Sequence, residues 1–237
     1  MTFCLGIYVE EGLVALADTR ITAGNEVYSN KKISIHEIQN HSLFIMTAGL
    51  RSVRDKSITY FNLHIKEQEQ HLNYMHEAAT AFGSMLKKVA EEDRETLEKE
   101  GYQFNLHAIV GGQMPKDEGH KLFLVFPEGN WIEINEGLKY QIIGNGNYGK
   151  PLLNRHLQLD TSLLEAANMA FLSFDATQVS ANDVDYPIDL VIYQKNSFKI
   201  QELRLQKSDM QGIAEQWNQG LKKALQSMDK TWLQSLS

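Results

Sequence analysis

The sequence predicts an α+β fold, a four-layer αββα sandwich of two antiparallel sheets with helices on both outer faces. Short β-prone runs recur in pairs that are separated by turn residues, which indicates antiparallel hairpins. Between them lie longer segments with apolar residues at helical spacing, and these also come in pairs. Two sheets packed face to face, each covered by a helix pair, would bury all of these apolar faces.

The first fifty residues are rich in β-prone runs. Strands are expected over Thr2–Val9, Gly12–Ala17, Lys32–His36 and Ser42–Met46. Glu10–Glu11 and Gln39–His41 are expected to be turns, and Thr22–Asn30 a polar loop. Because chain termini usually fray, an apolar strand that begins at residue 2 implies that the amino end is held inside the structure.

The remaining elements follow the same logic. Helical spacing predicts two long helices between Arg51 and about Glu100. The next expected elements are the strands Gln103–Val110, Lys121–Phe126, Trp131–Ile134 and Tyr140–Ile143, the helices Tyr148–Leu157 and Thr161–Asp175, and the strand pair Ile188–Gln194 and Phe198–Leu205. The tail, about residues 208–233, is expected to be an amphipathic helix whose apolar stripe contacts the core or another subunit. No compositional break divides residues 1–237, so a single domain is expected.

Composition argues against several function classes. The net charge is −7 and no basic stripe stands out, so no nucleic-acid partner is expected. No apolar run approaches the roughly 18–20 residues that span a bilayer, so no membrane role is expected. The first residues lack the basic segment of a secretory signal, and the single cysteine cannot form an internal disulfide. These features predict a cytoplasmic location.

Thr2 is the candidate catalytic residue with the clearest chemical rationale. A threonine hydroxyl is a weak nucleophile that needs a base. If Met1 is removed, Thr2 gains a free α-amino group, which titrates at about 7.7–8.0 and can take the hydroxyl proton near neutral pH. Nucleophile and base would then belong to one residue.

Such a site needs a cation that favours the neutral amine, a carboxylate that holds the cation, and backbone N–H groups that face the oxyanion. The chain offers Asp18 at the end of the second expected strand, Lys31 and Lys32 at the start of the third, and Gly49 after the fourth. Strand phase decides which lysine points inward. Each of these residues alone has an ordinary structural explanation, and the hypothesis depends on their joint spacing.

These residues carry a family resemblance. Thr2, then Gly12-x5-Asp18-x-Arg20-x2-Ala23-Gly24, Lys31-Lys32-Ile33 and Thr47-Ala48-Gly49, resemble the active-site framework of proteasome β subunits and of the bacterial HslV peptidase. The opening Thr-x-Cys-x-Gly, the stretch Ile143-Gly144-x3-Tyr148-Gly149-Lys150-Pro151, and Pro187-Ile188-Asp189-Leu190 resemble the bacterial proteasome-related Anbu family. The likeness spans nearly the whole chain, in order.

The resemblance implies an N-terminal-nucleophile hydrolase that cleaves a peptide or amide through an acyl ester on Thr2, without a cofactor. It implies that Lys32, the lysine favoured by the family pattern, tunes the amine and that Asp18 orients it. The Gly49 N–H would face the oxyanion. The resemblance also implies self-association into a large ring or open-helix homo-oligomer, and it leaves open whether an unfoldase partner exists.

One position departs from the proteasome pattern. The serine that supports the threonine amine in a late Gly-Ser-Gly turn is replaced by Asn145. The late Asp and Ser support residues have no unique counterpart, since Asp175, Ser180 and Asp183 all lie in range. A weakly active or inactive scaffold subunit, and an acyl-transfer enzyme that uses the same Thr2 chemistry, therefore remain alternatives.

Three other features have simpler explanations. The segment Gly144–Lys150 matches two nucleotide-binding patterns, but Pro151 stands where the phosphate-loop pattern needs Ser or Thr. It is expected to be a strand-to-helix turn. Cys4 is expected to be a core residue rather than a nucleophile. The histidines show no metal-binding spacing, with His71 and His76 five apart, so no metal site is expected.

Overall fold

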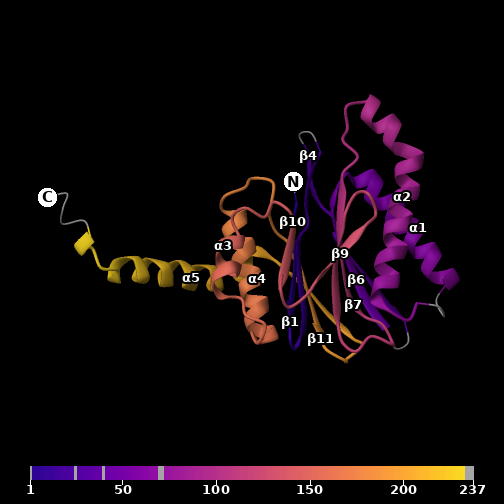
Figure 1. Cartoon of the computed structure of the whole chain (residues 1–237). Coiled ribbons are helices and arrows are strands. Elements are labelled where there is room, and N and C mark those ends of the chain that lie inside the picture. Colours follow the sequence, from indigo (N-terminus) through magenta and orange to yellow (C-terminus); the bar gives the residue numbers. More distant parts are fainter. Residues whose placement is uncertain (1, 24–25, 39–40, 69–71, 233–237) are drawn as a thin grey trace.

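The computed structural model describes residues 2–23, 26–38, 41–68 and 72–232, and it has the expected four layers (Figure 1). The strands are β1 (Phe3–Val9), β2 (Gly12–Asp18), β3 (Arg20–Ala23), β4 (Glu26–Ser29), β5 (Ile33–Ile38), β6 (His41–Gly49), β7 (Leu106–Gln113), β8 (Lys121–Val125), β9 (Trp131–Ile134), β10 (Tyr140–Gly144), β11 (Ile188–Gln194) and β12 (Ile200–Leu205). The helices are α1 (Arg51–Gln68), α2 (Met75–Lys99), α3 (Lys150–His156), α4 (Leu163–Gln178) and α5 (Lys207–Ser227).

The first sheet has the strand order β10-β1-β2-β11-β12, and every neighbouring pair is antiparallel. Alternate residues of β1 point to opposite faces, as the two-residue period of a strand requires. Phe3 and Leu5 pack on the side of α3 and α4, whereas Cys4 faces the second sheet. The expected hairpin of the first two strands is confirmed, with Cys4 paired to Ala17.

The second sheet has the order β5-β6-β7-β8-β9 and is also fully antiparallel. Helices α1 and α2 cover its outer face, and the rings of Phe61 and Phe82 meet edge to face within that core. Between the sheets a third apolar cluster joins Leu13 and Ala15 to Phe44 and Ile109. These three buried layers between four structural layers confirm the αββα prediction.

The prediction of a polar loop over 22–30 is wrong. Arg20–Ala23 and Glu26–Ser29 form β3 and β4, a separate two-stranded sheet. Ile21 and Tyr28 lie opposite each other in this pair, and aliphatic and aromatic residues favour strands even in a segment with polar neighbours. Of the turn expected at 39–41, residues 39 and 40 lie outside the described residues, and His41 begins β6.

The strand expected over 103–110 is displaced along the chain, since β7 runs over Leu106–Gln113. Gly111 and Gly112 continue the strand beyond the expected end at Val110. Gly112 has a φ of +150°, and a Cβ there would clash with the carbonyl oxygen of Ser42 in β6. Glycine is thus the residue that lets the two backbones approach.

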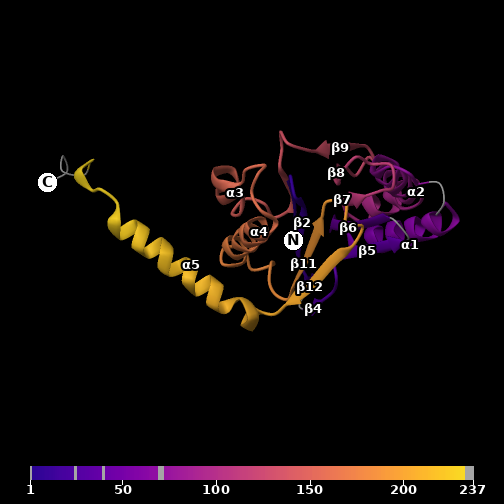
Figure 2. The same ribbon diagram turned by 90° about the horizontal axis from the view of Figure 1, so that it is seen from below.

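Helix α5 departs most from its expected extent and surroundings. It ends at Ser227 instead of continuing to 233, and Met228 adopts an extended conformation after it. The helix leaves the body of the molecule and projects away from it (Figures 1 and 2). Met210 is its one buried residue. No helix in the described part of the chain combines the length and apolarity that a bilayer crossing requires.

Candidate functional site

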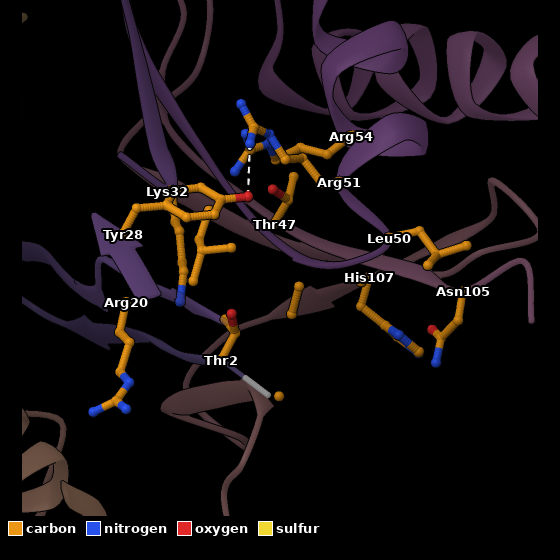
Figure 3. Close-up of a pocket in the computed structure, with 14 residues that line it drawn as sticks. Thr2, Arg20, Tyr28, Lys32, Thr47, Leu50, Arg51, Arg54, Asn105 and His107 are labelled. Carbon is orange, nitrogen blue, oxygen red and sulfur yellow. Dashed lines mark hydrogen bonds between the residues drawn. The ribbon is translucent and has the colours of Figure 1, made fainter. Parts of the chain in front are cut away.

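A pocket of about 610 Å³ opens where three strand ends meet (Figure 3). Five of the segments singled out in the sequence line it, through Thr2, Arg20, Lys32, Thr47–Gly49 and Gly144. Thr2 immediately precedes β1, Lys32 precedes β5, and Thr47 and Gly49 end β6. These residues are far apart in the chain. The face-to-face packing of the sheets brings the start of β1 beside the end of β6.

Lys32 and Asp18 form a buried ion pair at this pocket. The Lys32 ammonium donates to Asp18 Oδ1 at 2.6 Å, and the two side chains are 3% and 0% exposed. The Phe3 N–H donates to the same oxygen at 2.8 Å, which ties the carboxylate to the residue after Thr2. Burial raises the pKa of Asp18 above its usual value, although Lys32 and the Phe3 N–H oppose the rise.

The neighbouring lysine lies elsewhere. Lys31 pairs with Glu202 at 2.6 Å, and its side chain is 42% exposed. Strand phase therefore directs Lys32 inward and Lys31 to the surface. In Figure 3 the Lys32 ammonium points toward Thr2.

The backbone of Thr2 is held from the other side by the turn after β10. The Asn145 N–H donates to the Thr2 carbonyl oxygen at 2.7 Å. Gly144 has a φ of +84°, and a Cβ there would clash with the same carbonyl. The glycine-rich turn thus positions Thr2, and α3 begins right after it at Lys150.

Asn145 also buries its side chain, and among the described residues its Oδ1 has no hydrogen-bond partner.

Gly49 offers its N–H to the pocket through the register of β6 and β7. The Leu50 N–H donates to the Asn105 carbonyl oxygen at 3.1 Å, and Gly49 is opposite Leu106. In an antiparallel pair, hydrogen-bonded and non-hydrogen-bonded positions alternate. The Gly49 N–H therefore points away from β7, toward the side of β5, whose pairing with β6 starts only at Ile33 and Met46 and does not reach Gly49. A Cβ at Gly49 would clash with the Asn105 carbonyl, which explains the glycine.

The three late candidates do not line the pocket. Asp175 is buried in α4, and desolvation raises its pKa. The Ser180 hydroxyl is exposed and donates to the Ala176 carbonyl oxygen. Partial desolvation is the largest influence on the pKa of Asp183 and raises it, but opposing effects, the charge of Arg20 among them, bring the pKa below its usual value.

Sequence reasoning missed part of the pocket wall. Arg51 and Arg54, in the first turn of α1, line it together with Tyr28 and the side chain of Thr47. A signal was present in the sequence, since two cationic residues follow Gly49 closely at the start of an expected helix.

Two other kinds of site, a cysteine nucleophile and a metal centre, have little support among the described residues. Cys4 is fully buried, and burial raises its pKa far above the usual value, so it is a poor nucleophile. The described residues contain no group of three or more His, Cys, Asp or Glu side chains that could hold a metal ion. His71 lies outside the described residues.

Comparison with known proteins gives one consistent family. A family model described as "Proteasome subunit" matches residues 2–191. The chain is 26% identical to proteasome subunit beta 2 of Pyrobaculum islandicum, over 84% of this chain and 94% of that protein.

Among solved structures, an Anbu (Gly-1) mutant from Hyphomicrobium sp. strain MC1 superposes with a TM-score of 0.89 at 31% sequence identity. The superposition covers 97% of this chain and 99% of the Anbu chain. Anbu from Yersinia bercovieri, titled "ancestral beta-subunit", has a TM-score of 0.89 at 28% identity and covers 96% and 98%.

Proposed function

Because the chain belongs to the proteasome subunit family, we propose that it is a threonine peptidase or amidohydrolase that acts through Thr2 once Met1 is removed. The Thr2 Oγ1 attacks the carbonyl carbon of an amide, and the freed α-amino group accepts the hydroxyl proton. The amine then passes this proton to the leaving nitrogen as the C–N bond breaks. Water attacks the resulting acyl ester and releases the acid, which regenerates Thr2.

Two neighbours support these steps. A positive charge beside an amine favours its neutral form, and Lys32 supplies that charge on the Thr2 side of the pocket. The Gly49 N–H points to the side of β6 from which a bound carbonyl would approach Thr2, so it can stabilise the negative oxygen of the tetrahedral intermediate. No step of this chemistry needs a cofactor.

The observation that carries the proposal is the buried ion pair of Lys32 and Asp18. Burial of two charges costs several kcal/mol per ion before their attraction is counted. A buried pair is therefore weak evidence for a purely stabilising role. Its position at the wall of a pocket, bound to the residue next to Thr2, fits a role in the chemistry of the amino terminus.

We also propose that the chain self-associates. Helix α5 projects from the body and exposes apolar side chains along its length: Ile213 (40%), Leu221 (43%), Leu225 (67%), and, beyond its end, Met228 (66%) and Trp232 (76%). An exposed apolar stripe of this kind favours contact with another protein surface. The relatives named as proteasome subunits are, by name, parts of assemblies. A closed ring and an open helix are the two forms that we consider for such an assembly.

A second candidate function is an assembly scaffold with little activity. Asn145 favours it, because an amide replaces the serine that the proteasome pattern places near the threonine amine. Its buried Oδ1 lacks a hydrogen-bond partner among the described residues. In this case the fold would persist while turnover of Thr2 esters would be slow.

Intact mass and turnover separate the two candidates. The peptidase hypothesis requires purified protein that has lost one methionine and that hydrolyses peptide amides. Thr2→Ala should abolish hydrolysis, and Thr2→Ser should retain part of it because the hydroxyl nucleophile remains. A processed protein that cleaves no member of a diverse peptide-amide panel would support the scaffold instead.

A further inference from the structure

One wall of the pocket is strongly cationic. Arg51 and Arg54 lie side by side on this wall, across the pocket from Thr2 (Figure 3). None of the described residues that line the pocket is acidic. The wall therefore presents positive charge to whatever occupies the space next to the nucleophile.

The charge of this wall is only half balanced. Arg54 donates through Nε and Nη2 to Asp55 Oδ1 at 2.8 and 2.6 Å, and Arg51 donates through Nε to Asp55 Oδ2 at 3.3 Å. Arg51 Nη1 instead donates to the Tyr28 hydroxyl at 2.8 Å. Two guanidinium groups thus share one carboxylate, whereas Lys32 has Asp18 as its own partner.

Local preference does not explain these arginines. The first turn of a helix carries a partial positive charge, which favours acidic residues and disfavours cations there. The first turn of α1 contains no acidic residue and two arginines. Residues that contradict the local preferences of an element are expected at functional sites. An anion in the pocket would offset the unfavourable positive charge of the two arginines at the start of α1.

Thr47 provides an independent observation on the same wall. Its residue is 4% exposed, and its hydroxyl has no hydrogen-bond partner among the described residues. A buried hydroxyl without a partner is destabilising, because it has lost its hydrogen bonds to water without a replacement. In Figure 3 this hydroxyl lies beneath the guanidinium groups of Arg51 and Arg54. A ligand oxygen at this place could accept hydrogen bonds from all three side chains.

We propose that this wall binds a carboxylate, and that the preferred substrate carries glutamate or aspartate as the residue whose carbonyl is attacked. The assignment to that residue follows from β6. Thr47 and Gly49 are two apart and share one face of the strand, so a carbonyl at the Gly49 N–H places its own side chain toward Thr47. The term substrate rests on the proposed Thr2 chemistry, whereas binding of a carboxylate to this wall does not require that chemistry.

Binding to the full-length Thr2→Ala variant tests the proposal directly. Calorimetry would compare N-acetylated tetrapeptide amides that end in Glu, Gln or Leu. A hydrogen-bonded carboxylate predicts about tenfold or tighter binding of the Glu peptide over the Gln peptide. A fourth peptide ends in Leu with a free carboxylate. If it binds more tightly than the Glu amide, the wall recognises a chain end, and the side-chain assignment is overturned.

Three variants in the Thr2→Ala background sharpen this test. Arg51→Met should remove most of the preference for Glu, and Asp55→Asn should increase it, because the arginines lose their shared acceptor. Opposite effects from these two changes would not follow from a general loss of folding. Arg155→Met, on the exposed surface of α3, is the matched control and should leave the preference unchanged.

Equal binding of the Glu and Gln peptides would overturn the proposal. A neutral β-lactone, applied separately to the unmodified chain, reports on Thr2. An adduct on Thr2 without a Glu preference would defeat this inference alone. A Glu preference without an adduct would defeat the proposed hydrolase and leave a carboxylate-binding pocket.

Discussion

Lys32 and Asp18 form the buried ion pair at the wall of the pocket. Each has almost no contact with solvent, and each is the other's ion-pair partner. Removal of one member of such a pair leaves a buried charge without compensation. Stability and the proposed activity should therefore depend on both residues together.

We expect Lys32→Met to lower the free energy of unfolding by about 3–5 kcal/mol, because Asp18 would stay buried without its cation. Urea denaturation measures this change. The double variant Asp18→Asn with Lys32→Met should recover part of the loss, since Asn can still accept the Phe3 N–H.

Lys31→Met is the matched control. The exposed ion pair of Lys31 and Glu202 should contribute less than about 1 kcal/mol to the free energy of unfolding. Similar losses for Lys31→Met and Lys32→Met would contradict the buried pair.

The candidate site could be predicted from sequence only in part. Thr2, Lys32 and Gly49 were identified because their spacing matches a known framework, and the structure brings them to one pocket. The role of Asn145 as a backbone donor to Thr2 could not be foreseen, since it depends on how β10 meets β1. The arginine wall, formed by Arg51 and Arg54, was missed because two cationic residues after Gly49 indicate charge near the site but not that their side chains face the pocket.

The candidate pocket lies where the ends of several strands meet the first turn of α1. The carboxyl end of β6 turns at Gly49, and α1 begins two residues later with the arginine wall. Helix α5, in contrast, carries several exposed apolar residues outside the core. Gly49, at the end of β6, and Gly212, inside α5, have different roles, which substitution can distinguish.

Gly49→Ala should destabilise the fold by at least about 1–3 kcal/mol, because its φ of +148° is unfavourable for alanine and a Cβ would clash with the Asn105 carbonyl. Gly212→Ala, in the open surroundings of α5, should instead be neutral or stabilise by about 0.5–1 kcal/mol. Thermal or urea unfolding of both variants tests this contrast. Equal effects would mean that the Gly49 backbone is not constrained as described.

The stripe on α5 predicts an effect on assembly without an effect on the subunit. Leu221→Glu with Leu225→Glu should lower the solution mass measured by light scattering, because both side chains are exposed within a single chain. Gln226→Glu, a polar position on the same helix, is the control. An unchanged mass distribution for the double variant would remove α5 from the self-association surface.

Elements were easier to predict than their limits. Long segments such as the periodic helix α2 and the continuously apolar strand β2 were recognised because hydrophobic patterns report directly on burial. The β3–β4 hairpin was missed because its two strands form a sheet of their own, and the polar residues of the segment obscure the strand pattern. The overlong prediction for α5 has a related cause, since an apolar stripe indicates a helix face but not where the helix stops.

Three apolar clusters hold the four layers together. Polar side chains that are buried, such as His120, or partly buried, such as His36, lie close to them. His36 and His120 are two of the titratable ones. Burial lowers the pKa of each to about 4, and the His120 Nε2–H donates to the Val9 carbonyl oxygen at 2.8 Å. Both rings are therefore neutral in the folded protein over a pH range where the unfolded chain binds protons.

Stability should consequently rise with pH across this range. Between about 4 and the ordinary histidine pKa of 6.5, the unfolded state binds more protons than the folded state. The histidine contribution is complete above 6.5 and is lost as the pH falls toward 4.

Urea unfolding at several pH values should show a shallower slope for His36→Gln than for the unsubstituted chain. The difference isolates the ring from carboxyl groups such as Asp18, whose raised pKa acts in the opposite direction. His156→Gln, at an exposed position of α3, should leave the slope unchanged. Identical slopes for His36→Gln and the unsubstituted chain would contradict the burial of His36.

For the whole molecule, the fold and the family are established, and the central claim is that Thr2 is a nucleophile. The most direct measurement is covalent labelling of the full-length protein with a neutral β-lactone, followed by tandem mass spectrometry of the amino-terminal peptide. We expect a single adduct, an ester on the Thr2 hydroxyl of chains that have lost Met1, and none in Thr2→Ala. Processed chains that remain unlabelled, or that carry the adduct at another residue, would contradict it.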